Sequence, residues 1–206
     1  MSHLPTLIVL ATTAMPEGQA GLRDPALRPA LPDFQQIAQT LDLAQDAGLP
    51  VVLAASRWVK QQCEVFAPDV TCLEADGLHA AGSTGSSWVR AAAQAVQACS
   101  HASGWLVMPA PMADLLPSTL HQLCQALRQA PLVRPTYQMQ AGYPLGFSGE
   151  FYSELVRLQT EDQLRRMLVR YPSATIDTDD AAVCWGGAGT PGWPGASQAA
   201  RRGWPG

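Results

Sequence analysis

The sequence predicts an α/β protein with a three-layer, Rossmann-like arrangement, in which helices cover both faces of a mostly parallel sheet. Short apolar runs alternate with helix-length segments along most of the chain. The apolar runs are continuous, as they are in strands that are buried on both faces of a parallel sheet. A length of 206 residues is ample for one such domain.

The first half of the chain repeats strand and helix. Thr6–Ala11 is a continuous apolar run and predicts the first strand. In Phe34–Ala47 the apolar residues fall at helical spacing, and Gly48 follows as a typical C-terminal cap. The same reasoning predicts strands over Leu49–Ala54, Val70–Leu73 and Trp105–Met108 and helices over Ser87–Cys99 and Pro117–Ala130.

The second half mixes β-like segments with helices and is expected to close the substrate side. Its predicted elements are β-like segments at Val133–Tyr137 and Tyr143–Phe147, helices at Glu150–Leu158 and Glu161–Tyr171, and a strand at Ala174–Thr178. Residues 186–206 contain seven glycines and three prolines and twice repeat Gly-Trp-Pro-Gly. We expect one domain over residues 1–185 and a flexible tail over 186–206.

Composition excludes several classes of function. The net charge is −4 and the 13 basic residues are scattered, so no basic stripe indicates a nucleic-acid partner. The apolar runs are far shorter than the roughly 20 residues of a membrane helix, and no signal-like segment is recognisable, so we expect a cytoplasmic protein without membrane contact. The five cysteines form no Cys-x-x-Cys pair and favour reduced thiols over a zinc site or disulfide framework.

Two segments, Leu7–Gly21 and Gly104–Leu120, resemble the strand–loop motifs of the MobA-like NTP transferases, the nucleotidyltransferases of molybdenum cofactor maturation. Leu7–Gly21 occupies the position of the family's first strand and Leu-Ala-Ala-Gly loop. Thr13 stands in place of the loop's glycine, and the family's Arg and Lys are absent. Gly104–Leu120 occupies the position of the family's strand, Asp-Met-Pro loop and helix. In it, Met112 matches, whereas Pro111 stands where the family has its metal-binding Asp.

Further segments extend the resemblance. Gly82–Trp88 resembles a glycine-containing loop before the third helix, a place that suits an anion, although the serines there also fit a plain helix N-cap. Gly142–Pro144 stands for the family's Gly-His-Pro, and Glu161 and Arg165 match a later Gly-Asp-x-x-x-Arg pattern. Gly187–Pro191 replaces the family's second metal anchor with glycines.

The resemblance implies a nucleotidyltransferase fold and the transfer of CMP or GMP from CTP or GTP to molybdopterin, with Mg²⁺ as cofactor and a molybdoenzyme as possible client. It implies nucleotide-binding residues Ala11, Thr12, Thr13, Ser86, Ser87, Pro109 and Pro111, and substrate-binding residues Gly142, Tyr143, Pro144, Glu161 and Arg165.

No catalytic residue and no firm metal ligand follows from the motifs. Asp114 is the nearest remaining acid to Pro111, and Asp177, Asp179 and Asp180 follow later, all of them also readable as loop and turn residues. The alternative function is therefore a non-catalytic accessory or binding protein that keeps the fold but has lost the metal and triphosphate site.

Overall fold

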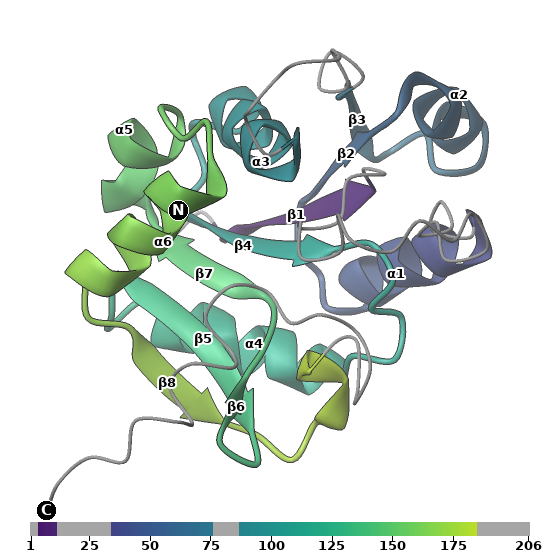
Figure 1. Cartoon of the computed structure of the whole chain (residues 1–206). Coiled ribbons are helices and arrows are strands. Elements are labelled where there is room, and N and C mark those ends of the chain that lie inside the picture. The colour runs from purple at the N-terminus through teal and green to yellow at the C-terminus, as the bar shows by residue number, and fades with distance from the viewer. Residues whose placement is uncertain (1–3, 12–33, 76–86, 185–206) are drawn as a thin grey trace, which may run out of the picture.

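A computed structural model describes residues 4–11, 34–75 and 87–184 of the chain (Figure 1). The predicted tail and the segments 12–33 and 76–86 lie outside the described residues. The elements in order are β1 (Thr6–Ala11), α1 (Phe34–Asp46), β2 (Val51–Ala55), α2 (Arg57–Phe66), β3 (Thr71–Glu74), α3 (Ser87–Ala98), β4 (Gly104–Pro109), α4 (Pro117–Ala126), β5 (Leu132–Tyr137), β6 (Gln140–Ala141), β7 (Leu145–Ser148), η3 (Gly149–Phe151), α5 (Tyr152–Leu155), α6 (Glu161–Arg170), β8 (Ala174–Asp177) and η4 (Ala181–Val183).

One mixed sheet organises the fold. Its strand order is β3-β2-β1-β4-β7-β5-β6, and β8 pairs with β5. The pairs β3–β2, β2–β1, β1–β4 and β5–β8 are parallel, whereas β7 runs antiparallel to both β4 and β5. The predicted α/β fold with a mostly parallel sheet is therefore confirmed.

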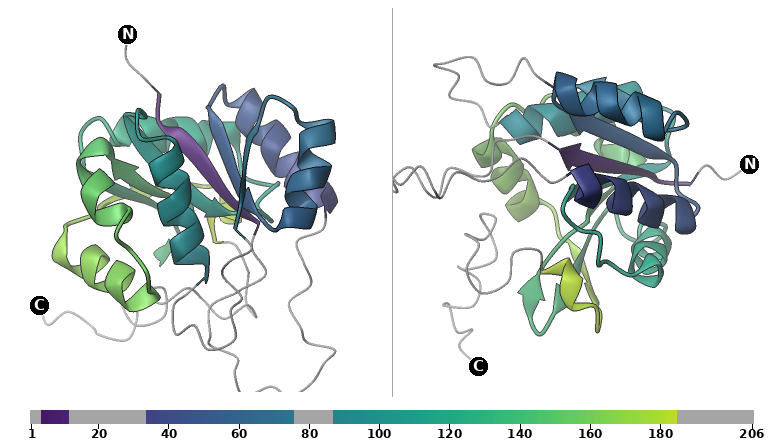
Figure 2. Two further views of the ribbon diagram at one scale, coloured as in Figure 1. Left: turned by 90° about the horizontal axis from the view of Figure 1, so that it is seen from above. Right: turned by 90° about the vertical axis from the view of Figure 1, so that its right-hand side faces the viewer.

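Helices cover both faces of this sheet (Figure 2). On one face α1 contacts α2 through Phe34 and Phe66, whose ring centroids lie 4.6 Å apart. On that face α1 also meets α4, where the His121 ring lies 2.9 Å from the Ala47 carbonyl oxygen. The opposite face carries α3, α5 and α6, whose apolar side chains meet those of β4 and β7. Within the part of the chain that the structure describes, no helix combines the length and apolar character needed to cross a bilayer.

The core is centred on β1. All six residues of this strand are buried, and Leu7, Ile8 and Val9 have no exposed surface. The strand has hydrogen-bonded neighbours on both edges and helices over both faces, so no position faces water. This explains why its sequence is a continuous apolar run.

Helix α2 is the longest of the elements that the sequence analysis does not predict; the two-residue strand β6 and the turn η4 are the others. Only Val59 and Cys63 of its ten residues are buried, so most of this helix faces solvent. Its local signal is Ser56, whose hydroxyl accepts a hydrogen bond from the Val59 N–H as an N-cap. The helix predicted at 150–158 is shorter in the structure, where the 3₁₀ turn η3 is followed by the four-residue helix α5.

Asp180 fastens the end of the described chain to the start of α4. Its Oδ2 accepts hydrogen bonds from the Leu116 N–H at 2.8 Å and the Thr119 hydroxyl at 2.7 Å, and its Oδ1 accepts from the Ala182 N–H at 3.1 Å. The side chain of Leu116, the N-cap residue of α4, makes no capping hydrogen bond. Asp180, which is 5% exposed, therefore supplies the cap from the other end of the sequence.

We expect Asp180→Asn to lower the free energy of unfolding by about 2–3 kcal/mol. The substitution replaces one carboxylate oxygen by an NH₂ group, which cannot accept a hydrogen bond and faces an N–H or O–H donor. Urea denaturation measures the loss. Asp179→Asn is the matched control, since Asp179 is exposed, and its effect is expected to stay within about 0.5 kcal/mol. Equal stability of the two variants would contradict the capping role.

Candidate functional site

The carboxyl ends of the parallel strands define the candidate nucleotide side. In register, Ala11 pairs with Ala55 of β2, and Leu10 pairs with Pro109 of β4, so the ends of β1 and β4 lie side by side. Ala11 has no exposed surface and can offer a ligand only its backbone. The predicted residues Thr12, Thr13 and Ser86 lie outside the described residues, and Ser87 is the first residue of α3.

The loop from β4 to α4 is held in place by hydrogen bonds to two other elements. The Ala110 N–H donates to the Leu10 carbonyl oxygen at 3.0 Å. The buried Thr40 hydroxyl of α1 donates to the Ala110 carbonyl oxygen. Met112 and Leu115 are each 2% exposed and anchor the rest of the loop in the core. Pro111 is half-buried in this fixed loop and presents no carboxylate.

The described residues do not fit a Mg²⁺ site. Asp114 is exposed and lies beyond the buried Met112. Both oxygens of Asp180 already accept hydrogen bonds. Within residues 4–11, 34–75 and 87–184, no group of three or more His, Cys, Asp or Glu side chains could hold a metal ion. Gly187 and Gly189 lie outside this part of the chain and have no ligating side chain.

Three side chains lie near one another beside the first turns of α3 and α6. The Trp88 indole N–H, in the first turn of α3, donates to Oε1 of Glu161 at 2.6 Å. Glu161 is the first residue of α6, where a carboxylate is favoured by the helix dipole, and Thr160 and Gln163 form a capping box around it. Burial, together with the nearby Glu161 charge, raises the pKa of Tyr143 well above its ordinary value.

These three residues lie at the same edge of the sheet as the ends of β1 and β4. Helix α3 runs back from this edge toward the start of β4, and α6 runs back toward the start of β8, so both helices begin at the carboxyl edge. Tyr143 precedes β7, which is antiparallel and therefore begins there too. The topology thus brings the predicted residues Tyr143 and Glu161 to the same edge of the sheet.

Gly142 and Pro144 have structural roles beside Tyr143. A Cβ at Gly142 would lie 2.2 Å from the Val183 carbonyl oxygen, so only glycine allows this close approach of two backbones. The Tyr143 N–H donates to that same oxygen at 2.9 Å, and the peptide bond from Tyr143 to the buried Pro144 is cis. This segment is therefore tied directly to η4.

Arg165 is the predicted substrate residue that the structure sets apart. It lies on the exposed face of α6, where its Nη1 pairs with Oδ1 of Asp162 at 2.5 Å. The pair is separated by three residues on one helix, an arrangement that contributes only a few tenths of a kcal/mol, about 0.2–0.5. Arg165 therefore belongs to the surface of α6 rather than to the contact between Trp88 and Glu161.

A small apolar cavity of about 20 Å³, room for little more than one water molecule, lies beneath the contact between Trp88 and Glu161. Every residue that lines it is apolar, with Trp88 and Val96 from α3, Val107 and Phe147 from the sheet, and Leu155 and Leu164 from α5 and α6 among them. Phosphate or a pterin ring edge would find no hydrogen-bonding partner there. A polar ligand must therefore meet Glu161 from the carboxyl edge.

Trp88 is the residue of this cluster that the sequence analysis does not assign. It is separated from Glu161 by 73 residues, so no local pattern connects the two. Its helical spacing fits an ordinary core position, and it is indeed only 6% exposed. The signal lies in the indole N–H, because a buried tryptophan N–H needs an acceptor.

Comparison with known proteins agrees with this geometry. The family model of the MobA-like NTP transferase domain matches residues 31–175. The chain belongs to this family. A search of curated proteins finds no match.

Several solved structures share the fold. The Rv0371C complex with manganese from Mycobacterium tuberculosis H37Rv is 21% identical, with a TM-score of 0.61, covering 86% of this chain and 89% of that one. CMP:2-keto-3-deoxy-manno-octonic acid synthetase complexed with CTP is 15% identical, with a TM-score of 0.54 and coverage of 84% and 90%. 4-Diphosphocytidyl-2C-methyl-D-erythritol synthase is 12% identical, with a TM-score of 0.56 and coverage of 89% and 92%. At these identities the likeness shows the fold alone.

The raised pKa of Tyr143 predicts a loss of stability in alkali. An unfolded tyrosine ionises near the ordinary value of 10.0, whereas buried Tyr143 stays protonated to higher pH. Its contribution is complete below pH 10.0 and is lost as pH rises from there toward the folded-state pKa. The urea concentration at the midpoint of unfolding is expected to fall as the pH is raised from 8 to 11. The fall is expected to be steeper for the unmodified protein than for Tyr143→Phe. Parallel curves would contradict burial of this phenol.

Proposed function

We propose that this MobA-like protein acts in molybdenum cofactor maturation, where it transfers CMP or GMP from CTP or GTP to molybdopterin for use by a client molybdoenzyme. The family supports the reaction class. CTP is the favoured donor, because the names of two proteins of the same fold refer to CTP or a cytidyl product. The proposed donor site follows Ala11 and Pro109, and the proposed acceptor site surrounds Tyr143 and Glu161.

The reaction forms one bond and breaks one. A terminal phosphate oxygen of molybdopterin attacks the α-phosphorus of the nucleotide, the bond from that phosphorus to the bridging oxygen of the β-phosphate breaks, and pyrophosphate leaves. The protein's part is to position both substrates at one edge of the sheet. Glu161 would accept hydrogen bonds from the N–H groups of the pterin edge, while Trp88 fixes the carboxylate from the other side.

The observation that carries this proposal is the meeting of Trp88, Tyr143 and Glu161 at the edge where β1 and β4 end. It gives an acceptor-side carboxylate a defined position within the fold of a nucleotidyltransferase. The cluster also lies over an apolar floor, so that its polar partners can come only from the substrate side.

Glu161→Gln is expected to raise the KM for molybdopterin about tenfold or more with little change in kcat, because a charge-assisted acceptor contributes about 1.5–3 kcal/mol. Pyrophosphate release with CTP or GTP, molybdopterin and Mg²⁺ or Mn²⁺ measures both constants. Glu150→Gln is the matched control, since Glu150 is exposed on η3. No release with any nucleotide and metal, or an unchanged KM, would refute the catalytic proposal.

The second candidate is a non-catalytic binding or accessory protein. The specific observation in its favour is the β4–α4 loop, where Pro111 occupies the expected acidic position and the nearest buried acid, Asp180, caps α4. Such a protein would bind molybdopterin at Glu161 without turning over a nucleotide. Titration of molybdopterin into the protein without nucleotide distinguishes this candidate from an inert fold.

Restoring acids is expected to restore magnesium-dependent nucleotide binding. Pro111→Asp and Gly189→Asp return one carboxylate to each anchor position, and two ligands on one ion are expected to act cooperatively. The double variant is therefore expected to bind CTP with Mg²⁺ more tightly than the product of the single effects predicts. Calorimetric titrations of the four proteins, with and without Mg²⁺, test this. Additive or absent gains would contradict the loss of a shared metal site at these positions.

A further inference from the structure

Two cysteines that the proposed function does not use lie opposite each other, one on α2 and one on β3. Cys63 is fully buried on the face of α2 that packs on the sheet. Cys72 is half-buried on β3, opposite Leu53 of β2 in the parallel register. Strand β3 is the edge strand of the sheet, so Cys72 is accessible from its open side.

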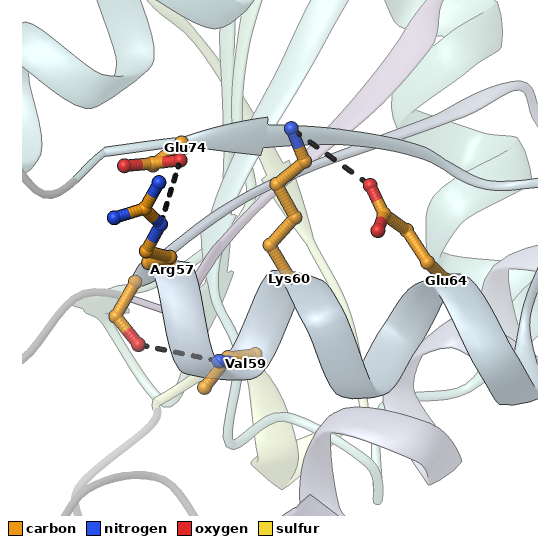
Figure 3. Close-up of polar contacts among 6 residues, drawn as sticks. Arg57, Val59, Lys60, Glu64 and Glu74 are labelled. Atoms are coloured by element: carbon orange, nitrogen blue, oxygen red, sulfur yellow. Dashed lines mark hydrogen bonds and ion pairs between the residues drawn. The ribbon is translucent and has the colours of Figure 1, made fainter.

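Their side chains occupy the same narrow layer between helix and strand. Glu74 lies two residues beyond Cys72 and therefore on the same face of β3. Its Oε2 is 3.9 Å from the Nε of Arg57 on α2, which identifies that face as the one that α2 covers (Figure 3). Lys60 also reaches up from this side of α2, with its Nζ 3.8 Å from Glu64. Cys63 lies one turn beyond Lys60 and is buried on the face of α2 that packs on the sheet, so its thiol and that of Cys72 lie in the same layer between α2 and β3.

We propose that Cys63 and Cys72 form a thiol modification site, which a hydroperoxide oxidises to an intramolecular disulfide. In the first step the Cys72 thiolate attacks one peroxide oxygen, the O–O bond breaks, and the leaving oxygen takes a proton. Cys72 becomes a sulfenic acid. In the second step the Cys63 sulfur attacks the Cys72 sulfur, the S–O bond breaks, and water leaves with the Cys63 proton. Two thiols are oxidised by two electrons, and the peroxide is reduced.

The environment of each thiol fits its role. The hydrogen bond from Cys63 lowers the pKa of the Cys72 thiol, against the opposing effects of burial and Glu64, and the Lys60 charge lowers it further. The same hydrogen bond, together with burial, raises the pKa of Cys63. Cys72 is thus the cysteine of the pair that ionises more readily and is the less buried of the two, as the attacking cysteine requires, and Cys63 is the resolving one.

The remaining cysteines lack this combination. Cys99 and Cys124 are buried, and burial raises the pKa of both thiols. Cys184 is half-buried like Cys72, but burial raises its pKa as well. Cys184 is therefore the matched control, because it is as exposed as Cys72 and has no thiol partner among the described contacts.

The full-length protein, treated with hydrogen peroxide, alkylated and digested without reductant, tests the proposal by mass spectrometry. The expected result is one linked peptide pair joining Cys63 to Cys72, with two of the five thiols lost and both recovered by dithiothreitol. Bonds between other cysteines or between two chains, or oxidation of Cys184 at the rate of Cys72, would overturn it. So would oxidation of Cys72 to the sulfinic acid without a linked peptide.

Variants separate the two steps. Cys63→Ser is expected to retain a sulfenic acid at Cys72 that dimedone labels, whereas Cys72→Ser is expected to leave Cys63 reduced. Cys184→Ser is expected to form the bond as the unmodified protein does. Circular dichroism checks that each variant folds. Where a variant does not fold, the linked peptide of the unmodified protein decides whether the proposal holds. A dimedone adduct at Cys63 in Cys72→Ser would reverse the assigned roles and contradict the proposal.

Discussion

The complete burial of β1 between two parallel neighbours is the constraint on which the rest of the structure depends. Since Thr6–Ala11 has hydrogen-bonded strands on both edges and helices on both faces, its direction fixes the direction of β2 and β4. Parallel strands end at one edge, and the helices that return from that edge must begin there. The first turns of α3 and α6 therefore meet, and Trp88 can reach Glu161. The candidate site is a consequence of strand direction.

A second constraint is the set of hydrogen bonds that the turn around Asp180 and Val183 makes to two distant segments. Asp180 caps α4, and the carbonyl oxygen of Val183, three residues on, accepts the Tyr143 N–H. One short turn thus connects the β4–α4 loop, on the proposed donor side, with the Tyr143 segment, on the proposed acceptor side. Among the described residues no cation pairs with the buried Asp180 carboxylate. Backbone and hydroxyl donors at the N-terminus of α4 hydrogen-bond it instead. Asp180, one of the acids that the sequence leaves open as metal ligands, thus already caps helix α4.

The sequence predicts well those parts of the structure that depend on local pattern. Strands β1 and β4 are continuous apolar runs, and α1 has a clear helical period, so their predicted bounds lie within a residue or so of the observed ones. Helix α2, a mostly exposed helix with two buried residues, is not predicted. In the site, Tyr143 and Glu161 followed from family resemblance, whereas Trp88 and Asp180 act through contacts across 73 and 64 residues that no local pattern contains.

The two sides of the site differ in how much change the structure permits. On the donor side, Asp114 lies between Met112 and Leu115, which are both buried, in a loop that Leu10 and Thr40 also hold. Swinging Asp114 into the place of Pro111 would expose both apolar side chains, at a cost of about 1.5–3 kcal/mol each. A substitute ligand from within this loop is therefore disfavoured, and the acid must come from another segment or from substitution at Pro111 itself. On the proposed acceptor side the carboxylate of Glu161 is held by Trp88. Under the proposed function, the departures from the family's motifs are therefore concentrated at the proposed metal and triphosphate site.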